Sequence, residues 1–235
     1  MIEVGAATHA GHRRAGNEDS ALATYPLFLV ADGMGGHAAG EVASAIAVAT
    51  LAELGPHEPA LPALLEQITT ANARIRANAR EPGRWGMGTT LTGIVALADG
   101  HWAVVNVGDS RVLLARGGEL RQLTTDHSEV QDLVQLGVLA PNEAAVHPMR
   151  HVITRSLGAD DDVDIDHQRL RLVPGDRVLV CSDGLTDDVP ADEIYWVLDT
   201  AAGPQEAADA LVTAALTHGG RDNVTVVVVD VVGDT

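Results

Sequence analysis

The sequence predicts an α+β fold with antiparallel β-sheet, and two observations support this class. Short runs of β-branched and apolar residues recur along the chain, separated by turn pairs such as Asp99-Gly100 and Gly117-Gly118. Segments with helical periodicity come in groups and do not alternate with single strands. A doubly wound parallel sheet would require that alternation.

Several runs have the composition and length of β-strands: residues 25–30, 89–98, 101–107, 111–116, 163–172, 177–182 and 224–232. A short turn separates 89–98 from 101–107, and 111–116 is followed closely by 119–123. This spacing is typical of β-hairpins, so we expect these neighbours to pair antiparallel.

Helical periodicity is clearest in residues 40–54, 61–80, 192–200 and 205–217. The stretch 128–156 differs, because a short helical pattern at 130–136 is followed by Gly137, Pro141 and Pro148 in irregular sequence. We expect this stretch to be a small flap inserted into the sheet scaffold. No sharp boundary divides the chain, so residues 1–235 are expected to form a single domain.

Composition narrows the classes of function. Hydrophobic residues make up 46% of the 235 residues and aromatic residues only 3%, so the chain can bury a core built from Val, Leu, Ile and Ala. The net charge is -18, and all 15 basic residues are Arg. This charge argues against nucleic acid or an anionic membrane as a partner. It also makes buried carboxylates costly unless cations neutralise them.

One cysteine, Cys181, excludes an internal disulfide and a multi-cysteine metal site, and we expect it to be a small buried residue at a strand end. No apolar signal segment is evident in residues 1–14. The apolar stretch 224–232 is interrupted by Asp230 and is too short to span a bilayer. We therefore expect a soluble, cytoplasmic protein.

Three acidic motifs stand at the edges of apolar runs, each with an Asp beside a Gly or an Asn. They are Asp32-Gly33-Met34-Gly35-Gly36-His37, Ser182-Asp183-Gly184-Leu185 and Gly220-Arg221-Asp222-Asn223. If their carboxylates converge, they supply oxygen ligands for Mg²⁺ or Mn²⁺. Taken singly, each motif is explained better by a tight turn or a cap.

The glycines after Asp32 also fit the loose dinucleotide-binding pattern between a strand and a helix. That fold needs a second strand that ends in an acidic residue about 20 residues later. Residues 53–59 contain Gly55, Pro56 and Pro59 and form no strand. The dinucleotide interpretation fails, which leaves glycines that let the backbone approach a ligand closely.

Two further segments contain charged residues that could bind phosphate or a metal. Arg14 precedes Glu18 and Asp19 closely, and a guanidinium can bind two phosphate oxygens at once. Asp109 lies in a Gly-Asp-Ser-Arg segment between two strand runs. In isolation, a solvated charged turn and a hairpin turn explain these segments.

The motifs gain meaning from their succession along the chain, which is Arg14-x-x-Asn17-Glu18-Asp19, Asp32-Gly33-Met34-Gly35-Gly36-His37, Gly86-Met87-Gly88-Thr89-Thr90, Gly108-Asp109-Ser110-Arg111, Asp126-His127-Ser128, Ser182-Asp183-Gly184 and Gly220-Arg221-Asp222-Asn223. This order and spacing, from about residue 5 to residue 230, resembles the metal-dependent protein phosphatases of the type 2C (PPM) family, in particular its bacterial members. The resemblance implies two packed antiparallel β-sheets flanked by helices, with a metal centre at one end of the sandwich.

The resemblance also implies a reaction. Such an enzyme hydrolyses phosphoserine and phosphothreonine in proteins by in-line attack of a water that bridges two divalent cations, Mn²⁺ or Mg²⁺. A covalent enzyme intermediate is not needed. Expected partners are phosphorylated proteins, among them Ser/Thr kinases and their substrates, and the chain is expected to act as a monomer.

By position, the resemblance assigns these ligands for two to three cations: Glu18, Asp19, Asp32, the Gly33 carbonyl, Asp109, Asp183 and Asp222. Asp32, Asp183 and Asp222 would hold the first cation. Asp32 and the Gly33 carbonyl, with Glu18 or Asp19, would hold the second. Asp109 and Asp183 match the pair that binds a third, weaker metal in bacterial relatives. Arg14 matches the arginine that binds phosphate.

One position departs from the family pattern. Eukaryotic relatives carry a His, proposed as general acid, two residues after the first metal-binding Asp, where this chain has Met34. His37 follows, as in bacterial members, and both proton donation and support of the loop stay open for it. For His127, His147 and His151 we expect ordinary surface histidines, with substrate contact as the alternative.

Two rival functions share these motifs. A binding module that has lost catalysis would be expected to lack one or more of Asp32, Asp183 and Asp222, and all are present. A metal-dependent phosphohydrolase of small phosphates or nucleotides would keep the same metal centre. The intact Asp set favours an enzyme over the binding module, and the phosphoprotein substrate class is what the resemblance implies.

Overall fold

The computed structural model describes residues 1–35, 39–144 and 146–233, and in this part of the chain two antiparallel β-sheets pack face to face. The first sheet has the order β1 (Ile2–His9), β11 (Val224–Val231), β10 (Arg177–Cys181), β7 (Arg111–Arg116) and β8 (Glu119–Gln122). The second has the order β2 (Asp19–Thr24), β3 (Leu27–Met34), β5 (Leu91–Ala96), β6 (Trp102–Val107) and β9 (Asp166–Leu170), with β4 (Gly88–Thr89) paired to β3.

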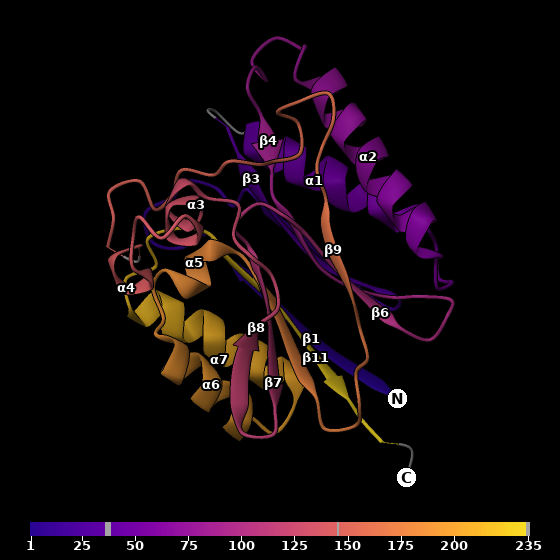
Figure 1. Ribbon diagram of the computed structural model, residues 1–235, viewed down its shortest axis with the longest axis vertical. Coiled ribbons are helices and arrows are strands. Elements are labelled where there is room, and N and C mark those ends of the chain that lie inside the picture. Colours follow the sequence, from indigo (N-terminus) through magenta and orange to yellow (C-terminus); the bar gives the residue numbers. More distant parts are fainter. Residues whose placement is uncertain (36–38, 145, 234–235) are drawn as a thin grey trace.

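Helices cover the outer face of each sheet (Figure 1). The second sheet is covered by α1 (Ala39–Ala52) and α2 (Leu61–Asn78), and the first by α6 (Ala191–Thr200) and α7 (Pro204–Thr217). Proline stands in the first turn of both α2 and α7, where its missing N–H costs nothing. The result is four layers: helices, sheet, sheet, helices.

The period of two along each strand explains these layers. In β10, Val178 and Val180 join the core between the two sheets, together with Phe28 of β3. Leu179 and Cys181 point the other way, into the core beneath α6 and α7. A strand buried on both faces needs apolar residues at successive positions, and residues 178–181 of β10 supply them. Cys181 is buried at the end of β10, as expected.

The α+β class, the two packed sheets and the two hairpins are confirmed, since β5 pairs with β6 and β7 with β8. The sequence did not predict β1 and β2. These are edge strands, and Gly5 is the one buried residue of β1. They gain their place by pairing with β11 and β3, and not by burying β-branched side chains.

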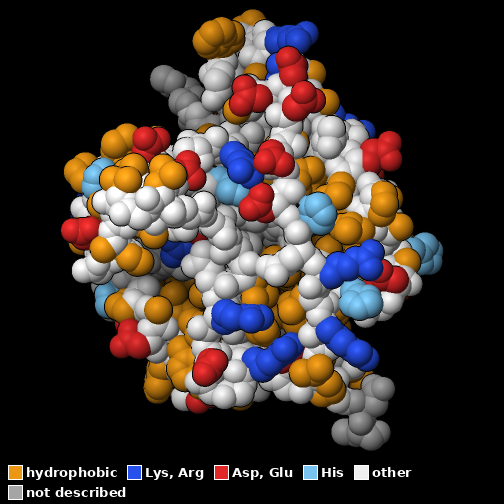
Figure 2. All heavy atoms as spheres, in the orientation of Figure 1, with side chains coloured by type: hydrophobic (Ala, Val, Ile, Leu, Met, Phe, Trp, Pro, Cys, Tyr) orange, Lys and Arg blue, Asp and Glu red, His pale blue; other side chains and the backbone are white. Residues whose placement is uncertain are grey.

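The stretch 128–156 carries the short helices α3 (Glu129–Gln135) and α4 (Pro141–Ala144). Ser128 caps α3, because its Oγ accepts a hydrogen bond from the N–H of Gln131. Apolar side chains gather over this stretch on the surface in Figure 2, where Leu136, Val138 and Val146 are exposed. Within the described residues, no helix is both long and apolar enough to cross a membrane.

Candidate metal centre

The carboxylates predicted as metal ligands meet at one end of the sandwich. Asp32 lies near the end of β3, Asp183 begins the short helix α5 (Asp183–Thr186) after β10, and Asp222 stands just before β11. Together with Arg14, Glu18 and Asp109 they line a cavity of about 440 Å³. Six residues from five separate segments of the sequence therefore share one pocket.

Glycine permits the approach of Asp183 to Asp222. A Cβ placed on Gly184 would lie 1.9 Å from the carbonyl oxygen of Asn223. Any larger residue at 184 would push α5 away from the segment that carries Asp222. The Ser-Asp-Gly motif thus needs its glycine for close packing.

A second close approach brings Glu18 and Gly33 together. A Cβ on Gly40 would lie 2.8 Å from Oε2 of Glu18 and 2.8 Å from the carbonyl oxygen of Gly33. A Cβ on Gly33 would in turn lie 2.2 Å from the Gly40 carbonyl oxygen. The two oxygens predicted to share a cation therefore face the same small space, which the absence of side chains at 33 and 40 keeps clear.

Hydrogen bonds to its backbone fix the position of Asp32, whose side chain lines the cavity. Its N–H donates to Oγ1 of Thr90 at 2.9 Å, and Oγ1 of Thr89 donates to its carbonyl at 2.9 Å. Asp19 lies directly opposite Asp32 in the β2–β3 pairing. The threonines of the Gly-Met-Gly-Thr-Thr motif therefore fix the position of Asp32.

Asp19 is half-buried and is not among the residues that line the cavity. Ser182 Oγ donates to its Oδ2 at 2.9 Å, whereas its Oδ1 is buried and has no hydrogen-bond partner within the described part of the chain. A buried carboxylate oxygen without a donor is costly. A cation, or a water bound to one, would satisfy it, so the residues fit a divalent metal.

The electrostatics of the cluster point the same way. Burial, together with neighbouring carboxylates, raises the pKa values of Asp32 and Asp183 well above the ordinary range. Burial also raises the pKa of Asp19 to about 6 and that of Asp109 to about 6. The pKa of Glu18 is also raised, and burial is the largest cause. Without cations, these groups oppose one another's ionisation.

Arg14 brings positive charge to the mouth of the cavity. Its Nη2 lies 2.6 Å from Oδ2 of Asp222, and its side chain is 54% exposed. Arg221 also lines the cavity, but its Nε is bound to Oδ1 of Asp188 at 2.6 Å. Arg14 differs in that the carboxylate it binds, Asp222, is itself one of the predicted ligands.

Asn223 has a role that sequence reasoning missed. Its Oδ1 accepts the N–H of Glu18 at 2.8 Å, and its Nδ2 donates to the carbonyls of Ala10 and Gly16 at 2.9 Å each. It therefore clamps the loop that carries Arg14 and Glu18 onto the start of β11. The motif placed Asn223 in a turn but gave no signal of this partner.

One of the histidines near the flap differs from the prediction. His127 is buried, at 5% exposure, so the expectation of a surface histidine is wrong for it. His151 lines the cavity, and its Nδ1 lies 3.2 Å from Oδ2 of Asp187. Ligand atoms of His151, Asp183 and Asp187 all lie within 4.8 Å of one another, and Asp187 was not predicted. His37 lies outside the described residues.

Comparison with known proteins identifies the family. A family model described as "Protein phosphatase 2C" matches residues 10–216. The chain belongs to the protein phosphatase 2C family. It is 45% identical to the serine/threonine protein phosphatase PstP of Mycobacterium tuberculosis over 237 residues, which cover 99% of this chain and 45% of that protein. This phosphatase 2C chain thus spans about half the length of that relative.

Other relatives match the phosphatase 2C chain over nearly their whole length. The serine/threonine phosphatase stp of Listeria welshimeri is 37% identical, with 95% of this chain and 93% of that protein covered. Among solved structures, the catalytic domain of PstP in complex with two manganese ions has a TM-score of 0.88, at 43% identity, with 99% of each chain covered. The expected fold, two sheets flanked by helices, is the fold of the family.

Proposed function

We propose that this protein is a metal-dependent serine/threonine protein phosphatase. The observation that carries the proposal is the buried carboxylate cluster, in which Asp32 and Asp183 have raised pKa values and Asp19 Oδ1 has no hydrogen-bond partner among the described residues. Relatives named serine/threonine phosphatases support the substrate class. The manganese ions of the related PstP catalytic domain support the choice of Mn²⁺ or Mg²⁺.

The residues proposed to hold two to three cations are Glu18, Asp19, Asp32, Gly33 through its carbonyl, Asp109, Asp183 and Asp222. All of them except Asp19 and Gly33 line the cavity. Asp32 would contribute to holding two of the cations, and Asp183 together with Asp109 would hold the third. When bound, the cations supply positive charge and a nucleophilic water at neutral pH.

The remaining chemistry belongs to the chain itself. The Arg14 guanidinium is exposed at the cavity mouth and is oriented by Asp222, so it can bind the non-reacting oxygens of a phosphate ester. Charge that develops on those oxygens during in-line displacement is then stabilised in place. Met34 lines the same cavity where a general acid is proposed in eukaryotic relatives, and its thioether cannot donate a proton. His37 is retained as a candidate proton donor.

We infer further that the substrates are phosphorylated proteins, including Ser/Thr kinases and their targets, and that one chain suffices. The support for a monomer is that a single chain supplies every proposed ligand. Residues 128–156 would be the flap, because Arg150, His151 and Ile153 from this stretch line the cavity. The single-domain organisation and the cytoplasmic location stay predictions of the sequence.

The test is a comparison of substrates with metal controlled. The EDTA-treated protein is assayed with phosphoserine and phosphothreonine peptides, p-nitrophenyl phosphate and nucleotides, with and without added Mn²⁺. The proposal expects Mn²⁺-dependent release of phosphate, with the phosphopeptides preferred over nucleotides. Preference for nucleotides would indicate a small-molecule phosphohydrolase, and lack of turnover with every substrate would indicate a binding module.

A further inference from the structure

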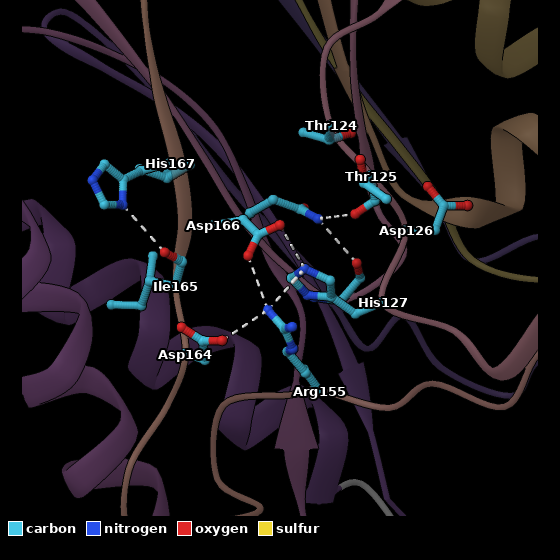
Figure 3. Close-up of polar contacts among 12 residues, drawn as sticks. Thr124, Thr125, Asp126, His127, Arg155, Asp164, Ile165, Asp166 and His167 are labelled. Carbon is cyan, nitrogen blue, oxygen red and sulfur yellow. Dashed lines mark hydrogen bonds and ion pairs between the residues drawn. The ribbon is translucent and has the colours of Figure 1, made fainter. Parts of the chain in front are cut away.

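His127 lies where three segments of the chain meet. It immediately precedes the flap, residues 128–156, and its ring is buried beside Asp166 and Arg155, as Figure 3 shows. The segments are the turn after β6 that carries Asp109, the neck of the flap, and β9.

The hydrogen bonds of the ring define its tautomer. The N–H of Gly108 donates to Nδ1 at 3.1 Å, so the ring proton is on Nε2. Nε2 lies 3.2 Å from Oδ2 of Asp166, to which it donates, and 3.3 Å from Nη1 of Arg155, which offers no acceptor. Arg155 Nη1 lies 2.9 Å from Oδ1 of the same carboxylate. The His127 ring therefore joins the Asp109 turn to the Asp166–Arg155 ion pair.

The turn is fixed on both sides of Asp109. The N–H of His127 donates to the carbonyl of Gly108 at 2.9 Å, so both peptide groups of Gly108 are bound by one residue. Gly108 has φ +112°, and a Cβ there would lie 2.5 Å from Cγ2 of Thr90. After Asp109, Arg111 Nε is bound by the carboxylate of Asp126 at 3.0 Å. Residues 126 and 127 thus hold the chain before and after the predicted ligand.

The same histidine closes the neck of the flap. Its carbonyl accepts the N–H of Thr154 at 2.8 Å, and Ser128 pairs with Ile153 in an isolated β-bridge. Arg155, the next residue along, forms the ion pair with Asp166 described above. Both ends of the flap therefore meet at His127.

We propose that His127 is a positioning residue for Asp109 and that its two ring nitrogens act on different partners. Nδ1 fixes the turn that carries Asp109, and Nε2 ties that turn to the flap through Asp166. Binding of a cation at Asp109 and order in the flap are then coupled through one side chain. This inference rests on the proposed function, because it takes Asp109 as a metal ligand.

Two substitutions separate the nitrogens. In His127→Asn, an amide oxygen near the place of Nδ1 can still accept from Gly108, but the donor to Asp166 is lost. In His127→Gln, the amide N–H₂ can reach Asp166, but the acceptor for Gly108 is lost. Asp166→Ala removes the flap link from the other side. The control is His57→Gln, the same substitution at an exposed histidine.

The readouts are amide hydrogen exchange of the metal-free protein and Mn²⁺ binding by calorimetry. For His127→Gln we expect faster exchange at Gly108 and affinity for the weakest Mn²⁺ site lowered by about tenfold or more, as in Asp109→Asn. For His127→Asn and Asp166→Ala we expect a protected Gly108, Mn²⁺ affinity close to wild type, and faster exchange at Thr154 in the flap neck.

Wild-type exchange at Gly108 and wild-type Mn²⁺ affinity in His127→Gln would overturn the proposal. An equal loss in His127→Gln and His127→Asn would also overturn it, because the ring would then serve packing alone. If neither His127 variant folds, Asp166→Ala decides: slow exchange at Thr154 in that variant would refute the flap link. A wild-type protein that binds no Mn²⁺ would refute the proposed function, whereas the exchange pattern would still test the contacts of His127.

Discussion

The guanidinium of Arg14 lies 2.6 Å from the carboxylate of Asp222, and the two residues are 208 positions apart in the chain. This ion pair links the residue proposed to bind phosphate to a residue proposed to bind metal. Because Arg14 is 54% exposed, the pair contributes little to stability by itself. Its significance is orientation, since Asp222 holds the guanidinium at the mouth of the cavity.

Replacement of Arg14 by Ala removes the proposed phosphate clamp. We expect the KM for p-nitrophenyl phosphate to rise roughly tenfold to a hundredfold, the value of one charge-assisted hydrogen bond, with a smaller change in kcat. Steady-state kinetics at saturating Mn²⁺ measure this, with Arg14→Lys as the variant that keeps the charge. An unchanged KM with a collapsed kcat would assign Arg14 a different role.

Replacement of Gly184 by Ala tests the close approach of α5 to β11. The added Cβ would lie 1.9 Å from the Asn223 carbonyl oxygen, so the backbone must shift. We expect the free energy of unfolding to fall by about 3 kcal/mol, measured by urea denaturation, and Mn²⁺ binding to weaken. The control is Gly203→Ala, where nothing lies within 4 Å of the added Cβ. Equal stability of the two variants would contradict this account.

Replacement of Asp32 by Asn should have opposite effects in the two metal states. Asp32 is buried among carboxylates and its pKa is raised by burial and by Asp19, so a neutral amide relieves repulsion. We expect a higher Tm than wild type in EDTA and loss of the Tm increase that Mn²⁺ gives the wild type. Thermal denaturation in both buffers measures this. A lower Tm in EDTA would mean that the carboxylate stabilises the metal-free fold.

The metal-free protein should lose stability as the pH rises. The pKa values of Asp19 and Asp109 are raised from 3.8 to about 6, so the folded state keeps protons that the unfolded state releases. Stability from these groups is full below pH 3.8 and is lost as the pH rises through about 6. Each group contributes a slope of up to about 1.4 kcal/mol per pH unit in this window.

Urea denaturation in EDTA across this window measures the slope, and Asp109→Asn should reduce it. Excess Mn²⁺ should reverse the sign, because cations bind the ionised carboxylates. If the stability of the metal-free protein instead rose with pH through this window, the fold would already stabilise the ionised carboxylates without a cation, and the prediction would be wrong.

The sequence predicted those site residues that carry a local signal. Asp32 and Asp183 follow apolar strand runs, and the glycines after Asp32 indicated a close approach of the backbone. The helices that cover the sheets were also predicted, because their apolar periodicity is local. The edge strands β1 and β2 were not, because their pairing with β11 and β3 depends on distant segments.

Residues that act through long-range contacts left no readable pattern. Asn223 binds the N–H of Glu18 across 205 positions, and His127 binds Asp166 across the flap. Asp187 directly follows α5 and lines the cavity, and no motif of the sequence marks it out. A carboxylate at the end of a strand has a local signal in the sequence. The distant residues that hydrogen-bond to its segment are set by tertiary packing and have no such signal.

The most direct test of the metal centre is the Mn²⁺-dependent hydrolysis of p-nitrophenyl phosphate by Asp183→Asn. Circular dichroism and thermal denaturation in EDTA first establish that the variant folds. The account predicts a loss of roughly a hundredfold or more in activity at any Mn²⁺ concentration, because this buried carboxylate would hold a cation. Wild-type activity in a folded Asp183→Asn protein would contradict the assignment of this cluster as the metal centre.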